Sequence, residues 1–294
     1  MRLDDSKRTI VLTTLAMLAF AANSLLCREA LKHTAIDAAS FTSLRLLSGA
    51  VMLWIIVRWR SGASQIDGDW RSAGALFVYA AGFSFAYRSL SAATGALLLY
   101  GAIHATMTGH GIASGERLQR WQIVGLLIAL AGMVGLLLPG LAPPPLGASL
   151  LMLTSGVAWG IYSLLGKSNA NKGRNPINTT AGNFLRAVPL AVVLSLIAAP
   201  GASWDANGVG YALLSGAITS GLGYVIWYEA LPALRATQAA TVQLCVPVLT
   251  ALGGAILLAE PITLRIIVAS AAILGGIGLL IHHHDSLKKG TVTE

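Results

Sequence analysis

The length of its uncharged stretches constrains this chain more than any other feature. Between Trp121 and Gly166 there is no Asp, Glu, Lys or Arg, and each other long apolar run contains at most one charged residue. A soluble domain usually carries about 25% charged residues, whereas this chain of 294 residues carries 11%. Because so few polar residues cannot cover a surface in water, we expect an integral membrane protein.

The apolar runs predict ten transmembrane helices, since each span needs roughly 20 apolar residues to cross about 30 Å of hydrocarbon. The uncharged stretch 121–166 is too long for one span, and Pro139-Gly140 with the prolines at 143–145 indicates a tight turn within it. The other predicted spans are 9–27, 38–57, 72–87, 89–115, 178–199, 206–228, 236–259 and 266–281.

The basic residues predict the orientation, because cytoplasmic loops carry an excess of Lys and Arg. With a cytoplasmic N-terminus, 14 of the 20 basic residues fall on the inner side. The others are Arg28, Lys32, Arg88 and Arg265 outside, and Arg45 and Arg186 within spans. We therefore expect both termini in the cytoplasm of a multi-pass plasma-membrane protein, which in a Gram-negative cell is the inner membrane. The net charge of +8 is scattered between apolar runs and does not indicate a nucleic-acid partner.

The chain also contains an internal repeat. AFAANSLLCR at 19–28 aligns with AWGIYSLLGK at 158–167, and Arg45 aligns with Arg186 at almost the same offset. We therefore divide the chain into two five-helix repeats, 1–140 and 141–294. Because five is odd, the second repeat enters the membrane in the opposite sense. The predicted fold is an all-α integral membrane protein with ten transmembrane helices as two inverted five-helix repeats.

Inverted repeats point to a transporter, because they allow two related packings, each open to one side, around a site near the midplane. An intramembrane enzyme is the main alternative. Its serine candidate, Ser114 in Gly111-Ile112-Ala113-Ser114-Gly115, lies at a helix end without the spacing of a nucleophile site. His104 and His110 are six residues apart and fall on different helix faces. We therefore expect no catalytic residue, no metal and no cofactor.

The two halves resemble the EamA-type repeats of the drug/metabolite transporter superfamily. The matching residues are Leu44-Arg45-Leu46, Trp159-Gly160, Leu185-Arg186, Tyr224, Trp227-Tyr228-Glu229-Ala230-Leu231, Pro247-Val248 and Glu260-Pro261. The first half departs from the pattern at Phe20-Ala21 and Ile103-His104, so we expect the fourth helix to be less kinked than the ninth.

This resemblance implies export of amino acids or other small metabolites, and the YddG-type aromatic amino-acid exporters are similar. A carrier of drugs or other metabolites is the alternative. The partners implied are the lipid bilayer and a small-molecule substrate, with the protein acting as a monomer or weak dimer.

Polar and aromatic side chains deep in a span should face a cavity or another helix. The predicted substrate-binding residues are Asn23, Tyr79, Tyr100, His104, Trp159, Tyr162, Tyr224, Trp227 and Gln243. Tyr100 and His104 share a helix face, and either line the substrate path or bond to neighbouring helices. The rings suit an aromatic or amphipathic ligand.

Arg45 and Arg186 lie inside their spans. We expect both to extend toward the membrane surface, with a role in gating as the second interpretation. Pro247 is the predicted helix kink. Glu116 and Glu260 lie at matching helix junctions, where each is expected to cap the helix that follows.

Overall fold

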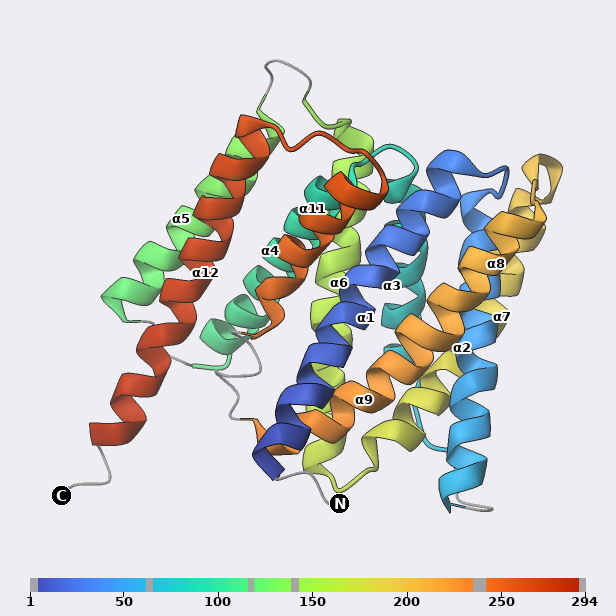
Figure 1. Cartoon of the computed structure of the whole chain (residues 1–294). Helices are drawn as coiled ribbons and strands as arrows, with labels where there is room; N and C mark the ends of the chain where they lie inside the picture. Colours follow the sequence, from blue (N-terminus) through green and yellow to red (C-terminus); the bar gives the residue numbers. More distant parts are fainter. Residues whose placement is uncertain (1–4, 62–65, 116–118, 139–142, 235–241, 291–294) are drawn as a thin grey trace.

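The computed structural model describes residues 5–61, 66–115, 119–138, 143–234 and 242–290, with side chains at all of these except 5, 6, 61 and 280–290. All regular secondary structure in these ranges is helical (Figure 1). The helices of the first half are α1 (Asp5–His33), α2 (Ala38–Ser61), α3 (Trp70–Tyr87), α4 (Ala92–Ala113) and α5 (Arg120–Leu137). Those of the second half are α6 (Leu146–Asn171), α7 (Pro176–Ala198), η1 (Ala199–Gly201), α8 (Ala206–Leu214), η2 (Ser215–Leu222), α9 (Gly223–Ala230), η3 (Leu231–Ala233), α11 (Cys245–Leu257) and α12 (Leu264–Gly290).

The described residues form ten helical rods when α8, η2 and α9 are counted as one. Six are long and apolar enough to cross a membrane, and two shorter apolar stretches lie in α11 and α12. The remaining two, α3 and α4, are also the most enclosed. The first twelve residues of α4 are all buried, so this helix faces protein more than lipid and has less need of strongly apolar residues.

Several helices extend beyond their apolar runs. The predicted span 9–27 becomes α1 from Asp5 to His33, and α2 continues to Ser61. Charged residues such as Arg and Lys are good helix formers, so the helix does not end where the apolar run ends. The predicted turn at Pro139-Gly140 and the first part of the span 236–259 lie outside the described residues.

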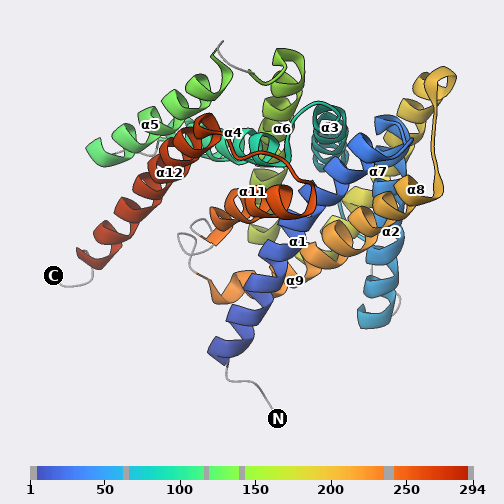
Figure 2. The same ribbon diagram turned by 45° about the horizontal axis from the view of Figure 1, so that its top comes forward.

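The rods of the first half pack against those of the second half (Figures 1 and 2). α1 contacts α8, η2, α9 and α11, while α6 contacts α3 and α4. α2 packs against α7, and α5 packs against α12 at the edge of the bundle. The first turn of α1 and the last turn of α12 lie at the same end of the bundle (Figure 1).

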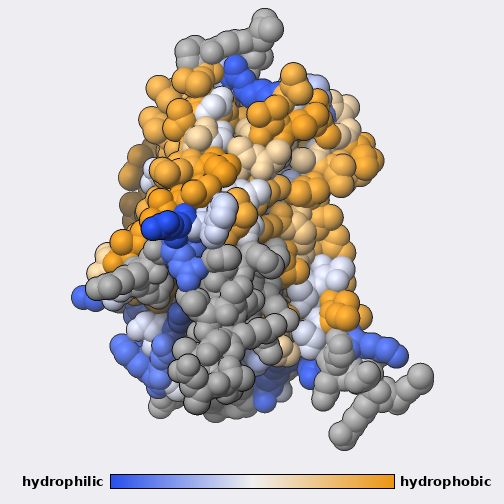
Figure 3. All heavy atoms as spheres, turned by 90° about the vertical axis from the view of Figure 1, so that its left-hand side faces the viewer, coloured by the Kyte–Doolittle hydropathy of each residue, from blue (hydrophilic) through white to orange (hydrophobic). Residues whose placement is uncertain are grey.

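The outer surface is apolar. Large side chains such as Trp121, Leu127, Ile197 and Ile267 are more than half exposed. Figure 3 views the α5 and α12 side, where hydrophobic residues cover most of the upper part and hydrophilic ones gather toward the lower end. Soluble monomers rarely expose apolar surface on this scale. The prediction of an all-α membrane protein is therefore confirmed.

Two loops at the end of α1 hold the halves together. Asp37 Oδ2 accepts from Ser203 N at 3.0 Å, and Asp205 Oδ1 accepts from Ala35 N at 3.2 Å. Burial alone would raise the pKa of Asp37, but hydrogen bonds from Ser40, Ser203 and Ala39 hold this pKa below its ordinary value. Each acid also caps a helix, since Asp37 accepts from the first turn of α2 and Asp205 from that of α8.

Candidate functional site

A narrow cavity lies at the centre of the bundle, where both halves meet. It is lined by Phe20, Asn23 and Ser24 of α1, Tyr79 and Phe83 of α3, Leu99, Tyr100 and Ile103 of α4, Trp159 of α6, Thr219 of η2, Tyr224 of α9, and Gln243. Its volume is about 30 Å³, which is room for about two water molecules. Pockets that hold small ligands occupy about 300–1,000 Å³, so the cavity is too small for such a ligand in this conformation, which we call closed.

Aromatic rings form one wall of the cavity, and Trp159 is at their centre. Its ring centroid lies 4.6 Å from that of Tyr79, 5.2 Å from Tyr224 and 5.3 Å from Tyr162. Phe20 presents an edge contact to Tyr224 at 5.9 Å. Such rings supply a large apolar contact area, and their hydroxyls and indole nitrogens fix the orientation of a ligand.

A chain of hydrogen bonds forms the polar wall and joins the two halves. Asn23 Oδ1 accepts from Ser215 Oγ at 2.7 Å and from Thr219 Oγ1 at 3.2 Å. Asn23 Nδ2 in turn donates to Tyr79 Oη at 3.5 Å. Ser215 and Thr219 belong to η2, a π-helical stretch in the middle of its rod, and π-helical turns are frequent at functional sites.

Arg45 extends this chain from α2 and is 2% exposed. Its Nη2 donates to Tyr79 Oη at 3.1 Å and its Nε donates to Ser220 Oγ at 3.4 Å. The guanidinium also lies 4.9 Å from the Phe83 ring centroid and 5.2 Å from that of Tyr79. The expectation that Arg45 reaches the membrane surface is therefore wrong. Its face of α2 points into the bundle, where hydroxyls and rings replace water.

Arg186, its counterpart in the repeat, has a different environment. It is half-buried on α7, and its Nη1 donates to the carbonyl oxygens of Asp67 at 2.8 Å and Gly182 at 3.1 Å. Asp67 lies in the segment before α3, so Arg186 reaches the start of that helix, and its extension toward the membrane surface stays a prediction. The two arginines are alike in sequence position but not in contacts.

Six of the nine predicted substrate-binding residues line the cavity: Asn23, Tyr79, Tyr100, Trp159, Tyr224 and Gln243. Tyr162 and Trp227 stand behind it, in contact with Trp159 and Phe20 respectively. His104 is not among the residues that line the cavity. Its Nδ1 lies 2.9 Å from the Tyr100 carbonyl oxygen of its own helix.

Pro247 sits next to a break in its helix. Gln243 is helical, Leu244 is a turn residue and α11 begins at Cys245. Proline lacks the N–H that would bond the carbonyl four residues earlier, which here is that of Gln243. α4, which has Ile103-His104 at the matching position, continues unbroken.

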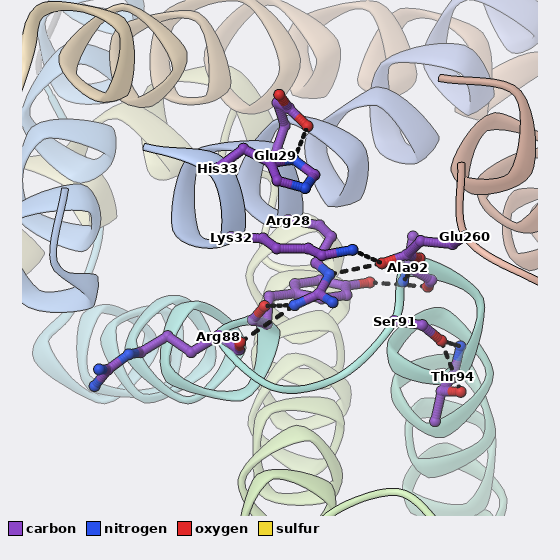
Figure 4. A network of polar contacts seen from close by, with 10 residues as sticks. Arg28, Glu29, Lys32, His33, Arg88, Ser91, Ala92, Thr94 and Glu260 are labelled. Carbon is purple, nitrogen blue, oxygen red and sulfur yellow. Dashed lines mark hydrogen bonds and ion pairs between the residues drawn. The ribbon is translucent and has the colours of Figure 1, made fainter. Parts of the chain in front are cut away.

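A second polar network lies near the C-terminal end of α1 (Figure 4). Arg28 Nε donates to Glu260 Oε1 at 2.7 Å, and the other oxygen of Glu260 accepts from Ala92 N at 2.7 Å. Arg28 Nη1 also donates to the Tyr87 carbonyl oxygen at 2.8 Å. The Arg28 and Glu260 side chains are 9% and 6% exposed. The network ties α1 and the start of α4 to the segment after α11.

The expected cap at Glu260 is therefore wrong in its partner. Glu260 caps α4 and not α12, the helix that follows it. Ala259 has φ of 48°, an uncommon left-handed conformation for a residue other than glycine. The Glu260 N–H bonds back to the Gly254 carbonyl oxygen at 3.0 Å, and this reversal turns the side chain toward α1. Glu116 lies outside the described residues.

The sequence has clear relatives. Residues 146–282 match the EamA-like transporter family. An uncharacterized protein of Pseudomonas aeruginosa is 56% identical over 276 residues, which cover 94% of this chain and 95% of that protein. An uncharacterized transporter of Archaeoglobus fulgidus is 35% identical over 169 residues, which cover 56% of this chain and 59% of that protein. An EamA-like transporter domain therefore makes up most of the second half of this chain.

This EamA-like protein is thus a multi-pass membrane transporter, as the resemblance implied, and the family match covers its second half. Its fold has a counterpart in a crystal structure that shares 20% sequence identity, with a TM-score of 0.66 and coverage of 98% of this chain and 99% of that one. At that identity the likeness concerns the fold alone.

In this EamA-like transporter, six lining residues were missing from the predicted set: Phe20, Ser24, Phe83, Leu99, Ile103 and Thr219. The prediction selected polar groups and deep Trp or Tyr rings, and so passed over Phe and aliphatic neighbours. Helical spacing contains the missing signal, since Phe20 is three residues from Asn23 and Phe83 is four from Tyr79.

Proposed function

We propose that this transporter exports small metabolites, namely amino acids with aromatic or amphipathic side chains, by alternating access. The observation that carries the proposal is the central cavity, which combines aromatic rings with amide and hydroxyl groups from both halves. Such a lining suits a ligand with an apolar body and a polar end.

The packing of the helices supports two inverted repeats, 1–140 and 141–294. The contacts of α6 with α3 and α4 have their counterpart in those of α1 with the α8–α9 rod and α11. α2 with α7 and α5 with α12 are pairs of equivalent helices. A two-fold relation between the halves would generate this pattern, with the cavity close to its axis.

The closed cavity implies that substrate enters after a movement of the helices. With both termini cytoplasmic, the end that holds Arg28 and Glu260 faces outward, so their network closes the outer side in this conformation. Alternating access then requires the Arg28–Glu260 contact and the Asp37–Ser203 contact to separate when the transporter opens outward.

Transport is tested with purified protein in liposomes. We expect labelled phenylalanine or tryptophan to exchange across the bilayer faster than in empty vesicles, and unlabelled substrate inside should accelerate the uptake. A panel of other amino acids, organic acids and drug-like cations defines the range. Flux equal to that of empty vesicles for the whole panel would contradict a transport function.

A further inference from the structure

Arg45 is a buried cation without a counter-charge. None of the ion pairs among the described side chains includes it, although it is 2% exposed near the centre of the bundle. A buried charge is costly unless it is paired. Here the partners are two hydroxyls and two ring faces, all of them neutral.

One nitrogen of this guanidinium has no hydrogen-bond partner. Nη2 and Nε donate to Tyr79 and Ser220, whereas Nη1 has no acceptor among the residues that the structure describes. Most buried polar groups are paired, and an exception calls for an explanation. A ligand that is absent from this conformation provides one.

Tyr79 connects the Arg45 guanidinium to the cavity. Its hydroxyl oxygen receives donors from both Arg45 and Asn23, which leaves its own O–H to act as a donor. Both donors have a second bond, because Asn23 Oδ1 accepts from Ser215 and Thr219 and Arg45 Nε donates to Ser220. Tyr79 and Phe83 line the cavity and cover the guanidinium, so a shift of these rings on opening exposes Nη1.

Building on the proposed transport function, we propose that Arg45 and Tyr79 form a subsite that binds the carboxylate of the substrate. One cation with a free N–H and one neutral O–H match a single negative charge. A phosphate dianion would need further cations, since phosphate sites combine several charge-assisted donors. The rings of Trp159 and Tyr224 then receive the apolar or aromatic part of the same molecule.

The test uses four probes that share a phenyl ring: phenylalanine, 3-phenylpropionate, phenylalaninamide and phenethylamine. The first two carry a carboxylate and the last two do not. Calorimetric titration of the purified full chain should show about 10-fold or tighter binding of the two carboxylates, because a charge-assisted hydrogen bond contributes that much.

The variant Arg45→Gln should remove this preference. Carboxylate affinity should fall about 10- to 100-fold, while the affinity for the two probes without a carboxylate changes less than about threefold. Arg45→Lys should recover part of the loss, and Tyr79→Phe should weaken the carboxylates alone. The matched control is Arg58→Gln, which removes an exposed cation from the same helix and should leave the preference intact.

Equal wild-type affinity for all four probes, or no binding of the carboxylates, would overturn the subsite. So would an equal loss for all four in Arg45→Gln, which marks a structural role. If Arg45→Gln does not fold, Arg45→Lys and Tyr79→Phe decide the question. Exchange of labelled phenylalanine or tryptophan in liposomes would leave the proposed function standing in each case.

Discussion

At the scale of single residues, Tyr100 and His104 are one turn apart on α4 but have different surroundings. Tyr100 lines the cavity, whereas the His104 ring bonds to the backbone of its own helix. The His104 ring therefore has a partner within α4 and is not among the residues that line the cavity.

We expect Tyr100→Leu to raise the apparent KM for transport about 5- to 50-fold, because the ring and hydroxyl of Tyr100 contribute to the ligand surface. His104→Ala is the matched control and should change KM less than about twofold. Liposome uptake at graded substrate concentrations measures both, after size-exclusion chromatography shows that each variant is folded. A larger effect from His104→Ala than from Tyr100→Leu would contradict this placement of the substrate path along α4.

Residue depth was predictable from the sequence, but residue direction was not. Asn23 and Tyr79 were expected in the site because an uncharged span leaves polar groups few places to go. Arg45 was expected at the membrane surface, because a long side chain two turns inside α2 can extend that far. The same position also allows the side chain to point into the bundle. The direction depends on which face of α2 meets α3 and η2, and this is a property of the packing.

At the scale of elements, the turn after α11 decides where two helices are joined. The positive φ of Ala259 sends Glu260 back to Arg28 and to the first N–H of α4. The sequence places an acid at this junction but contains no signal for its partner, which is 232 residues away. The long helices themselves were predictable, because their apolar runs and capping residues are local.

Glu260→Gln should lower the free energy of unfolding by about 3 kcal/mol, because it leaves the Arg28 charge buried without its counter-charge. A lower midpoint of thermal unfolding in detergent measures the effect. Glu29→Gln is the control, since the contact of Glu29 with His33 is half-exposed, and it should cost less than about 1 kcal/mol. Equal midpoints for wild type and Glu260→Gln would show that the ion pair does not hold the bundle closed.

At the scale of the whole molecule, the two halves meet at one closed cavity, and one end of the bundle is fastened by the Arg28–Glu260 network. The count of rods and the membrane character followed from the sequence, because lipid imposes helices of a given length. The closed state did not, since the balance between two packings depends on a few long-range contacts. Such contacts can shift a two-state equilibrium only by their difference in free energy between the states.

Thiol labelling at the cavity tests alternating access most directly. Thr219→Cys introduces a reactive group in η2 after Cys27 and Cys245 are replaced by Ala, and a membrane-impermeant thiol reagent is added to one side of sealed vesicles at a time. Addition of Glu260→Gln, which weakens the outer closure, should raise the labelling rate from outside and lower it from inside. Labelling from neither side, or rates that rise together on both sides, would contradict a central site exposed to one side at a time.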